Sequence, residues 1–280
     1  MLCMSDRFCF DNAVTLSNNS QTHCKVKTCT DIVHKIACVC KIYKIELLKS
    51  QKRYSNEGGR LKAISAADDV LNEVALLSDL SHTNIVPLIC TEEVNGKLKL
   101  YFPYYGSPLM TPQEGLLYTS LAPNLVSPDM LVRLAKHISA ALQYIHGLNI
   151  CHRDVKPDNI FMSHGGIFLL SDFGSARKYS GVTSESPATI GFFPPEVCGE
   201  EPTEHDPQKA DLWALGITVL CCAIGRLPYA IDDADDVIAL LQAIAMRDMI
   251  EEHVTRLTAE VSNFTKILLS KTPSDRIYLV

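Results

Sequence analysis

Several features are missing from this 280-residue sequence, and each absence narrows the range of functions. No run of like charges is present and the net charge is −6, so neither nucleic acid nor an anionic membrane surface is an expected partner. The longest clearly apolar run, Leu212 to Ile224, is too short to span a bilayer. The N-terminus, MLCMSDRFCF, lacks the long hydrophobic core of a signal peptide. A small-molecule or protein substrate fits these absences better.

Closely spaced C-x-x-C pairs are absent as well. The 11 cysteines are irregularly spaced, and Cys221-Cys222 lies inside an apolar run, which favours reduced, packed thiols and a cytoplasmic location. One stretch could still be interpreted as a zinc site. Its candidate ligands are His23, Cys24, Cys29, His34, Cys38 and Cys40. Because ACVCKI alternates like a strand with both of its cysteines on one face, we expect core thiols rather than zinc ligands.

Glycine does not occur before Gly58. Glycine is the residue that adopts positive φ values freely and lets a backbone approach a ligand closely, so no turn in the first 57 residues has that freedom. The polar stretch 49–60, which holds Gly58 and Gly59, predicts a mobile loop.

Hydrophobic periodicity predicts a strand-rich first third and a helix-rich remainder. Strands are expected over 32–48, 84–89 and 97–102, with a hairpin turn at Asn95-Gly96 and a helix over 66–80. Turn formers concentrate in FPYYGSP, residues 102–108, which indicates a domain boundary. Further helices are expected over 128–146, 210–224, 234–246 and 256–269. This order predicts a mixed α+β fold with two lobes.

Polar side chains of several types are concentrated in CHRDVKPDN, residues 151–159. A second polar motif, SDFG, places Asp172 twenty residues after His152. The apolar runs NIFM and GIFLL lie between the motifs around a glycine turn, and they predict a β-hairpin that presents both motifs at one end. A charged solvated loop without chemical purpose is the alternative interpretation of residues 151–159.

Together these motifs resemble the eukaryotic protein kinases of the serine/threonine type. Residues 151–159 match the catalytic-loop pattern, and SDFG matches the metal-binding motif. FFPPE at 192–196 matches the end of the activation segment, and DLWALG at 211–216 matches the start of the long central helix. The resemblance implies a two-lobed α+β protein-kinase fold, with a small antiparallel-sheet N-lobe plus one helix and a larger helical C-lobe. The implied boundaries are 1–102 for the N-lobe, 103–106 for the hinge and 107–280 for the C-lobe.

The resemblance also implies ATP-dependent transfer of the γ-phosphoryl group to a serine or threonine hydroxyl of a protein substrate, with Mg²⁺ as the metal. Asp154 would accept or orient the proton of the hydroxyl, and Lys156 would sit against the transferring group. Asn159 and Asp172 supply the oxygen ligands that Mg²⁺ prefers. A regulatory protein would be a further partner.

Upstream, the family pairs a strand lysine with a helix glutamate. Lys41 at the end of CVCK matches the lysine, whereas Lys35 and Lys44 are nearby alternatives. Glu73 matches the helix glutamate, and its alternative interpretation is a simple surface glutamate.

The adenine ring would lie against residues from several segments. By resemblance these are Val26, Val39, Phe102, Pro103, Tyr105 and Phe161. Pro103 would offer its carbonyl and Tyr105 its amide, while Phe161 could equally belong to the core.

Downstream residues match structural parts of the family. Glu185 falls where many kinases carry an activating phosphothreonine, so its carboxylate is predicted to pair with Arg153. Thr189 matches the threonine that contacts the catalytic aspartate and lysine. Three further residues complete the set: Glu196 and Arg276 as an ion pair, and Asp211 as a brace for the catalytic loop.

The sequence departs from the family in one place. The family covers the phosphates with a glycine-rich turn, but Asn19, Gln21 and Cys24 stand at the glycine positions here. Two functional classes therefore remain, an active kinase and a pseudokinase that serves as a binding or allosteric scaffold. SPLM at 107–110 and the inserted loop before the helix are similar to calcium/calmodulin-dependent kinase kinases, and the last helix of the family is expected to be truncated after PSDR.

Overall fold

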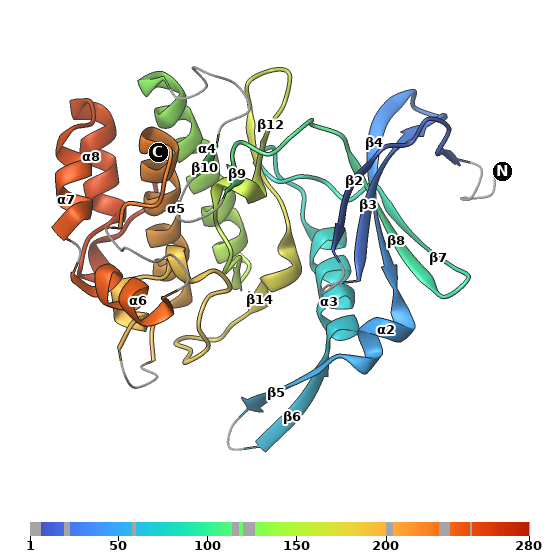
Figure 1. The fold of residues 1–280 in the computed structure, drawn as a ribbon, viewed down its shortest axis with the longest axis horizontal. Helices are drawn as coiled ribbons and strands as arrows, with labels where there is room; N and C mark the ends of the chain where they lie inside the picture. Colours follow the sequence, from blue (N-terminus) through green and yellow to red (C-terminus); the bar gives the residue numbers. More distant parts are fainter. Residues whose placement is uncertain are drawn as a thin grey trace. The chain divides into compact units, whose positions relative to one another are not determined.

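The computed structural model describes residues 7–19, 23–57, 60–113, 118–119, 127–199, 204–229, 236–246 and 248–279. The chain divides into two compact units (Figure 1). The first comprises Met1–Ser81 with Val86–Tyr104, and the second comprises His82–Ile85 with Tyr105–Val280. The first unit holds the large sheet and the second holds most of the helices, so the predicted α+β class is confirmed.

The first unit is built on a six-stranded antiparallel sheet. Its strands are β1 (Phe8–Cys9), β2 (Thr15–Asn19), β3 (Cys24–Asp31), β4 (Ile36–Lys44), β7 (Cys90–Val94) and β8 (Lys97–Pro103). The order is β1-β3-β4-β8-β7, and β2 also pairs with β3. The predicted turn at Asn95-Gly96 joins β7 to β8, with positive φ at both residues.

The edge strand β1 contributes the side chain of Phe8 to the packing on one face of this sheet. Phe8 stacks on Tyr101 with ring centroids 3.8 Å apart, and both rings pack with the buried thiols of Cys29, Cys38 and Cys40. Cys38 and Cys40 therefore share a buried face, as the alternation predicted. Burial raises the pKa of the Cys40 thiol to about 12. Cys29, Cys38 and Cys40 are thus core thiols, whereas His34 is exposed and His23 and Cys24 are half-buried.

Helix α3 (Ala66–Asp79) forms where the periodicity predicts it. Ser65 and Asp68 form a capping box, in which each side chain bonds the backbone N–H of the other residue. The buried side chains on this helix include Val70, Leu77 and Glu73.

The region before α3 differs from the prediction. The predicted strand 32–48 ends at Lys44, and a short helix α2 (Ile45–Ser50) that was not predicted follows it. The predicted mobile loop is instead a paired hairpin of β5 (Lys52–Glu57) and β6 (Arg60–Ser65). A polar composition does not exclude a hairpin whose strands are joined by two glycines. Gly58 and Gly59 themselves lie outside the described residues.

The predicted strand 84–89 is wrong. Pro87 has no backbone N–H, so it cannot donate a hydrogen bond to a neighbouring strand at that point. Within the segment Ile85 forms only an isolated bridge to Leu170, and the strand that pairs with β8 begins at Cys90.

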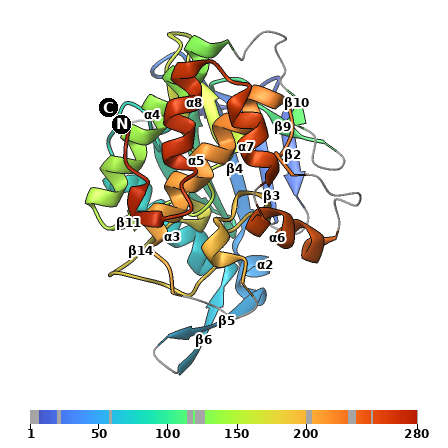
Figure 2. The ribbon, with the colours of Figure 1, turned by 90° about the vertical axis from the view of Figure 1, so that its left-hand side faces the viewer.

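The second unit is organised around α5 (Pro207–Ile224), which is buried along most of its length. It packs against α4 (Pro128–Gly147), α7 (Asp248–Thr255) and α8 (Ala259–Leu268), an arrangement visible in Figure 2. Ser127 caps α4 by accepting the N–H of Met130, and Pro128 occupies its first turn. Helix α6 (Val237–Met246) matches the prediction for 234–246, whereas α7 was not predicted.

Short strands complete the second unit. They are β9 (Thr111–Pro112), β10 (Tyr118–Thr119), β11 (Ile150–Cys151), β12 (Ile160–Met162), β13 (Phe168–Leu170) and β14 (Arg177–Lys178). Strands β12 and β13 pair in register as the predicted hairpin. Within the described part of the chain, no helix combines the length and apolarity that crossing a membrane requires.

Candidate functional site

Lys41 and Glu73 form an ion pair within the first unit. Lys41 Nζ lies 3.0 Å from Glu73 Oε1, and the Glu73 side chain is only 2% exposed. Lys41 comes from the central strand β4, and Glu73 comes from the buried face of α3. The interpretation of Glu73 as a surface residue is therefore wrong, and the alternatives Lys35 and Lys44 are both exposed.

Several predicted adenine contacts share one face of the sheet with Lys41. Strand register places Val26 opposite Lys41 and Phe102 opposite Val39, and directly opposed residues lie on the same face. Lys41 Nζ lies 5.6 Å from the centroid of the Phe102 ring. Pro103 ends β8 opposite Cys38.

The second unit contains Tyr105 and Phe161. Both are half-buried, and burial raises the pKa of the Tyr105 hydroxyl above its ordinary value. Phe161 lies on β12 opposite Leu169.

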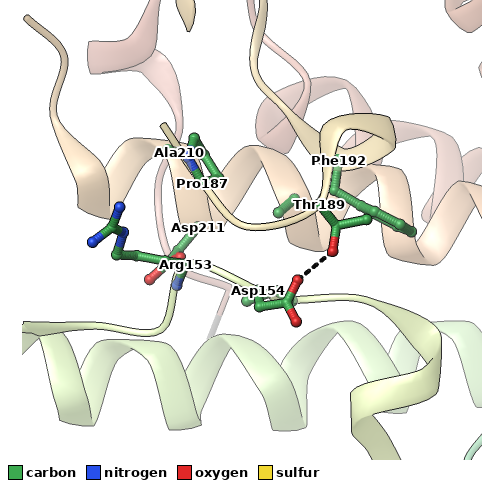
Figure 3. A pocket seen from close by; sticks show the side chains of 9 residues that line it. Arg153, Asp154, Pro187, Thr189, Phe192, Ala210 and Asp211 are labelled. Carbon is green, nitrogen blue, oxygen red and sulfur yellow. Dashed lines mark hydrogen bonds between the residues drawn. The ribbon is translucent and has the colours of Figure 1, made fainter. Parts of the chain in front are cut away.

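Asp154 is held through both of its carboxylate oxygens. The hydroxyl of Thr189 donates to Oδ1 at 2.6 Å, the bond drawn in Figure 3. Asn159 Nδ2 donates to Oδ2 at 2.9 Å, and Lys156 Nζ lies 3.0 Å from that same oxygen. Lys156 also donates to Thr189 Oγ1 at 3.0 Å, so two of the three side chains around Asp154 are also bonded to each other. The predicted contacts of Thr189 with the aspartate and the lysine are confirmed.

Lys156 keeps its positive charge in this environment. Burial alone would lower its pKa, but the carboxylates of Asp154 and Asp158 outweigh burial and raise the pKa above the ordinary lysine value. A raised lysine pKa means that the charge is present at all pH values below it. The ammonium group is therefore charged throughout the neutral and mildly alkaline range.

The loop that carries Asp154 is braced from α5 by Asp211. Its carboxylate accepts the backbone N–H groups of His152 and Arg153, each at 2.8 Å. Burial would raise the pKa of Asp211, but hydrogen bonds, including one from His146, lower it below the ordinary value. This brace, which the sequence predicted, holds Arg153 at a φ of 68°, a left-handed conformation that is costly for a residue with a side chain.

The grouping of His146, Cys151 and Asp211 has metal-ligand spacing but is explained without a metal. His146 bonds Asp211 through Nε2 and the hydroxyl of Tyr278 through Nδ1. Both ring nitrogens are therefore occupied. No motif in the sequence indicated that His146 and Tyr278 would support Asp211.

His152 connects the catalytic loop to the SDFG motif. Its Nε2 donates to the carbonyl of Ser171 at 3.0 Å, which leaves Nδ1 to accept the N–H of Asp154 at 3.3 Å. The ring is buried against Phe173. The next residue after Ser171 is Asp172, which is exposed and has a φ of 61°.

Asn159 and Asp172 have the chemistry of Mg²⁺ ligands. The N–H and hydroxyl of Ser171 both donate to the carbonyl of Asn159, at 2.9 Å each, which fixes the backbone of one motif to the other. Asn159 turns its amide nitrogen to Asp154, so its amide oxygen faces the other way. An amide oxygen and an exposed carboxylate suit a hard divalent cation.

The segment 183–189 is fixed by contacts with the catalytic loop. Arg153 Nη1 donates to Glu185 Oε2 at 2.7 Å, as predicted, and Nη2 donates to the carbonyl of Ser186 at 2.8 Å. The N–H of Ala188 donates to the carbonyl of Arg153 at 3.0 Å. A two-bond β-bridge between Thr183 and His205, which the sequence did not predict, holds the start of the segment.

The predicted pair of Glu196 and Arg276 is present. The guanidinium donates two bonds to the carboxylate, at 2.6 and 2.8 Å, and the Arg276 side chain is completely buried. Its Cζ lies 5.0 Å from the Trp213 ring centroid on α5.

The substituted glycine positions can be described only in part. Asn19 ends β2 and Cys24 begins β3, while Gln21 lies outside the described residues. His23, just before β3, has a φ of 49°, so the backbone adopts a left-handed conformation there without a glycine.

Comparison with known proteins finds similarity to protein kinases. A model described as a protein kinase domain matches residues 22–279. A relative from Dictyostelium discoideum, "Serine/threonine-protein kinase stk11 homolog", is 34% identical over 61% of this chain and 30% of its own length. The Saccharomyces cerevisiae "Serine/threonine-protein kinase TOS3" is 25% identical over 83% of this chain and 46% of its own. The Caenorhabditis elegans "Serine/threonine-protein kinase chk-2" is 28% identical over 77% and 45%. The chain thus spans less than half the length of these relatives.

Proposed function

Because the chain belongs to the protein kinase domain family, we propose that it transfers the γ-phosphoryl group of ATP to a serine or threonine hydroxyl of a protein. Its α+β fold is the kinase fold that the motifs predicted, and the resemblance to serine/threonine kinases is confirmed. The single observation that supports activity most strongly is the set of contacts around Asp154 from Thr189, Asn159 and Lys156.

In this proposal Asp154 orients the attacking hydroxyl and accepts its proton. Its carboxylate is already fixed by donors on both oxygens, so the geometry needs no reorganisation before the reaction. Lys156 keeps its charge and would stabilise the negative charge on the phosphoryl group during transfer.

The nucleotide would be bound by the remaining predicted residues. Lys41, held in place by Glu73, would bind the phosphates, and the apolar face that holds Val26, Val39 and Phe102 would contact adenine. Pro103, Tyr105 and Phe161 are proposed as further adenine contacts. Asn159 and Asp172 would hold Mg²⁺, which when bound neutralises phosphate charge. The boundaries at 102 and 106, the hinge and a cytoplasmic location belong to the same proposal.

The proposal is tested with γ-labelled ATP, Mg²⁺ and two protein probes, casein and a lysine-rich histone. We expect labelling of a probe or of the chain itself by the wild type, and loss of that labelling in Asp172→Asn, because an amide cannot supply the charge that the metal requires. Asp129→Asn, an exposed change in the first turn of α4, is the matched control and should label like the wild type.

A pseudokinase is the second candidate, and the absence of glycine at positions 19, 21 and 24 favours it. In that case ATP with Mg²⁺ would raise the thermal midpoint of unfolding, but the wild type would label no probe. Labelling that persists unchanged in Asp172→Asn would contradict the active-kinase proposal directly.

Glu185 already supplies a negative charge to Arg153, so we expect activity without phosphorylation of the segment 183–189. Glu185→Ala removes the partner of Arg153, and since the pair is partly exposed its worth is about 1 kcal/mol, or up to about fivefold in kcat. The measurement is kcat of protein expressed without other kinases. Ser184→Ala, a change at the neighbouring and also exposed residue, should leave kcat unchanged. An unaltered kcat in Glu185→Ala would show that the pair does not order the segment for catalysis.

A further inference from the structure

The N-terminal segment 7–10 lies on the sheet of the first unit but precedes the matched kinase domain, which begins at residue 22. Its strand β1 pairs with β3 over two residues. The N–H of Ile32, just after β3, donates to the carbonyl of Arg7 at 2.9 Å. The segment is therefore joined to the sheet in the way that an added peptide strand is, through its main chain.

The aromatic side chains of the segment occupy an apolar surface on the sheet. Phe8 is only 5% exposed, and its ring stacks on that of Tyr101. The Tyr101 hydroxyl donates to Glu92 at 3.0 Å, which holds the ring in place for this stack. Phe10 packs against the same cluster, and Lys99 Nζ lies 5.9 Å from the centroid of its ring. The surface thus accepts two aromatic side chains with one residue between them.

Arg7 supplies a charge that the surface requires. The Asp31 side chain is completely buried, and Arg7 donates to its Oδ2 from Nε at 3.0 Å and from Nη2 at 2.6 Å. The other oxygen accepts the backbone N–H groups of Val33 and His34. The exposed ring of His34 also lies against Oδ2, at 2.9 Å. Hydrogen bonding from Arg7 holds the pKa of Asp31 well below its ordinary value. A buried carboxylate of this kind favours an arginine directly before the first aromatic residue.

The strands that hold this segment also carry the proposed nucleotide residues. Strands β4 and β8 lie side by side (Figure 1), with Cys40 opposite Tyr101 and Val39 opposite Phe102. We call the side with Cys40 and Tyr101 the thiol face. Since successive side chains of a strand point to opposite faces, Val39, Lys41 and Phe102 lie on the other side, the Lys41 face. Each residue that anchors the segment on β4 or β8 is thus the direct chain neighbour of a residue on the Lys41 face.

We propose that the thiol face is a binding site for a peptide with the pattern arginine, aromatic, any residue, aromatic, that the chain's own segment 7–10 fills it, and that filling it positions the Lys41 face for the nucleotide. Phe8 and Arg7 are then positioning residues, which act through β4 and β8 without touching ATP. The last step of this proposal rests on the proposed nucleotide binding.

The test releases the segment in the full chain by the double substitution Arg7→Ala and Phe8→Ala. We expect Kd for ATP with Mg²⁺, measured by calorimetry, to rise at least about fivefold, the lower end of ordinary coupling between two sites. Hydrogen exchange of the backbone N–H groups of β4 and β8 should become faster. Kd is measured well below the thermal midpoint, where the chain is folded, so a loss of stability alone leaves it unchanged.

A synthetic peptide of residues 7–14, acetylated and amidated and with Cys9→Ser, is then added in trans. At concentrations on the order of 1 mM, comparable to the effective concentration of a tethered segment, it should bind the double variant and restore both Kd and the slow exchange. The same peptide with Phe8→Ala should not bind. The wild-type chain should not bind either peptide, because its own segment already fills the site.

Val14→Ala is the matched control, since it removes an apolar side chain shortly after the segment at a position that is 58% exposed, and it should leave Kd for ATP unaltered. If the double variant does not fold, Phe8→Leu takes its place, because it keeps an apolar side chain and loses only the stack. The expected rise in Kd is then smaller.

An unchanged Kd for ATP in the double variant would overturn the proposal and leave Phe8 as a core residue only. Failure of the peptide to bind the double variant would overturn it as well. If the wild type binds no ATP, the proposed nucleotide binding fails, and hydrogen exchange decides alone. Protection of β4 and β8 that is lost in the double variant and restored by the peptide then supports the docking site, whereas unchanged protection contradicts it.

Discussion

Asp154→Asn is expected to lower kcat for phosphate transfer by about 10²–10⁴-fold, the usual contribution of a positioned general base. The substitution keeps the shape of the side chain. An amide oxygen can still accept from Asn159 and Lys156, and the new NH₂ group can face the Thr189 hydroxyl, so the loop should keep its structure. What is lost is the second carboxylate oxygen and the negative charge, and with them the ability to take a proton.

The measurement is steady-state kinetics on the histone probe, together with the shift in thermal midpoint that ATP and Mg²⁺ produce. The shift should be retained, because Asp154 is not among the proposed metal ligands. Asp129→Asn again serves as the control for the same chemical change at an exposed position. A loss of kcat smaller than tenfold would contradict the role of Asp154 as the base.

Arg276→Ala should destabilise the second unit by about 3–5 kcal/mol, because it removes one partner of an ion pair whose guanidinium is fully buried and whose carboxylate is largely buried. The fully buried guanidinium makes two bonds to Glu196 and further bonds to the carbonyls of Ser270 and Lys209. Arg276→Lys should not restore stability, since an ammonium group cannot reproduce this planar arrangement of donors.

The free energy of unfolding by urea is the quantity to measure. Arg256→Ala provides the comparison, because Arg256 forms an ion pair with Glu252 in which both side chains are well exposed, and its loss should cost less than about 1 kcal/mol. If Arg276→Ala does not fold, Glu196→Gln keeps the shape of the partner and should show a smaller, measurable loss. If the Arg276 and Arg256 substitutions lower the free energy of unfolding equally, burial does not increase the contribution of the Arg276–Glu196 pair to stability.

Much of the site could be predicted from the sequence because it depends on local motifs. Asp154, Lys156 and Asn159 lie within six residues, and the hairpin that follows fixes where Asp172 appears. Long-range contacts such as Glu185 with Arg153 were predicted only because a family pattern supplied the partner. The bridge of Thr183 to His205 has no such pattern and could not be predicted from periodicity.

The errors in the fold have a common physical cause. Helix α2 follows β4 without a break in apolar character, so a continuous run was assigned to one strand. In the hairpin β5–β6 the backbone pairing decides the structure, whereas the polar composition suggested a loop. At 84–89 the apolar residues suggested a strand, and a single proline prevented it.

The aromatic stack of Phe8 on Tyr101 has a practical consequence for anyone preparing shorter versions of the chain. The kinase-domain match begins at residue 22, so a version trimmed to that limit would lose Phe8 and leave the Tyr101 ring and the adjoining thiols open to water. Newly accessible apolar surface of this kind promotes self-association, and solvent access allows the buried cysteines to oxidise in air. Expression of the chain from residue 7 or earlier should keep the purified material monodisperse.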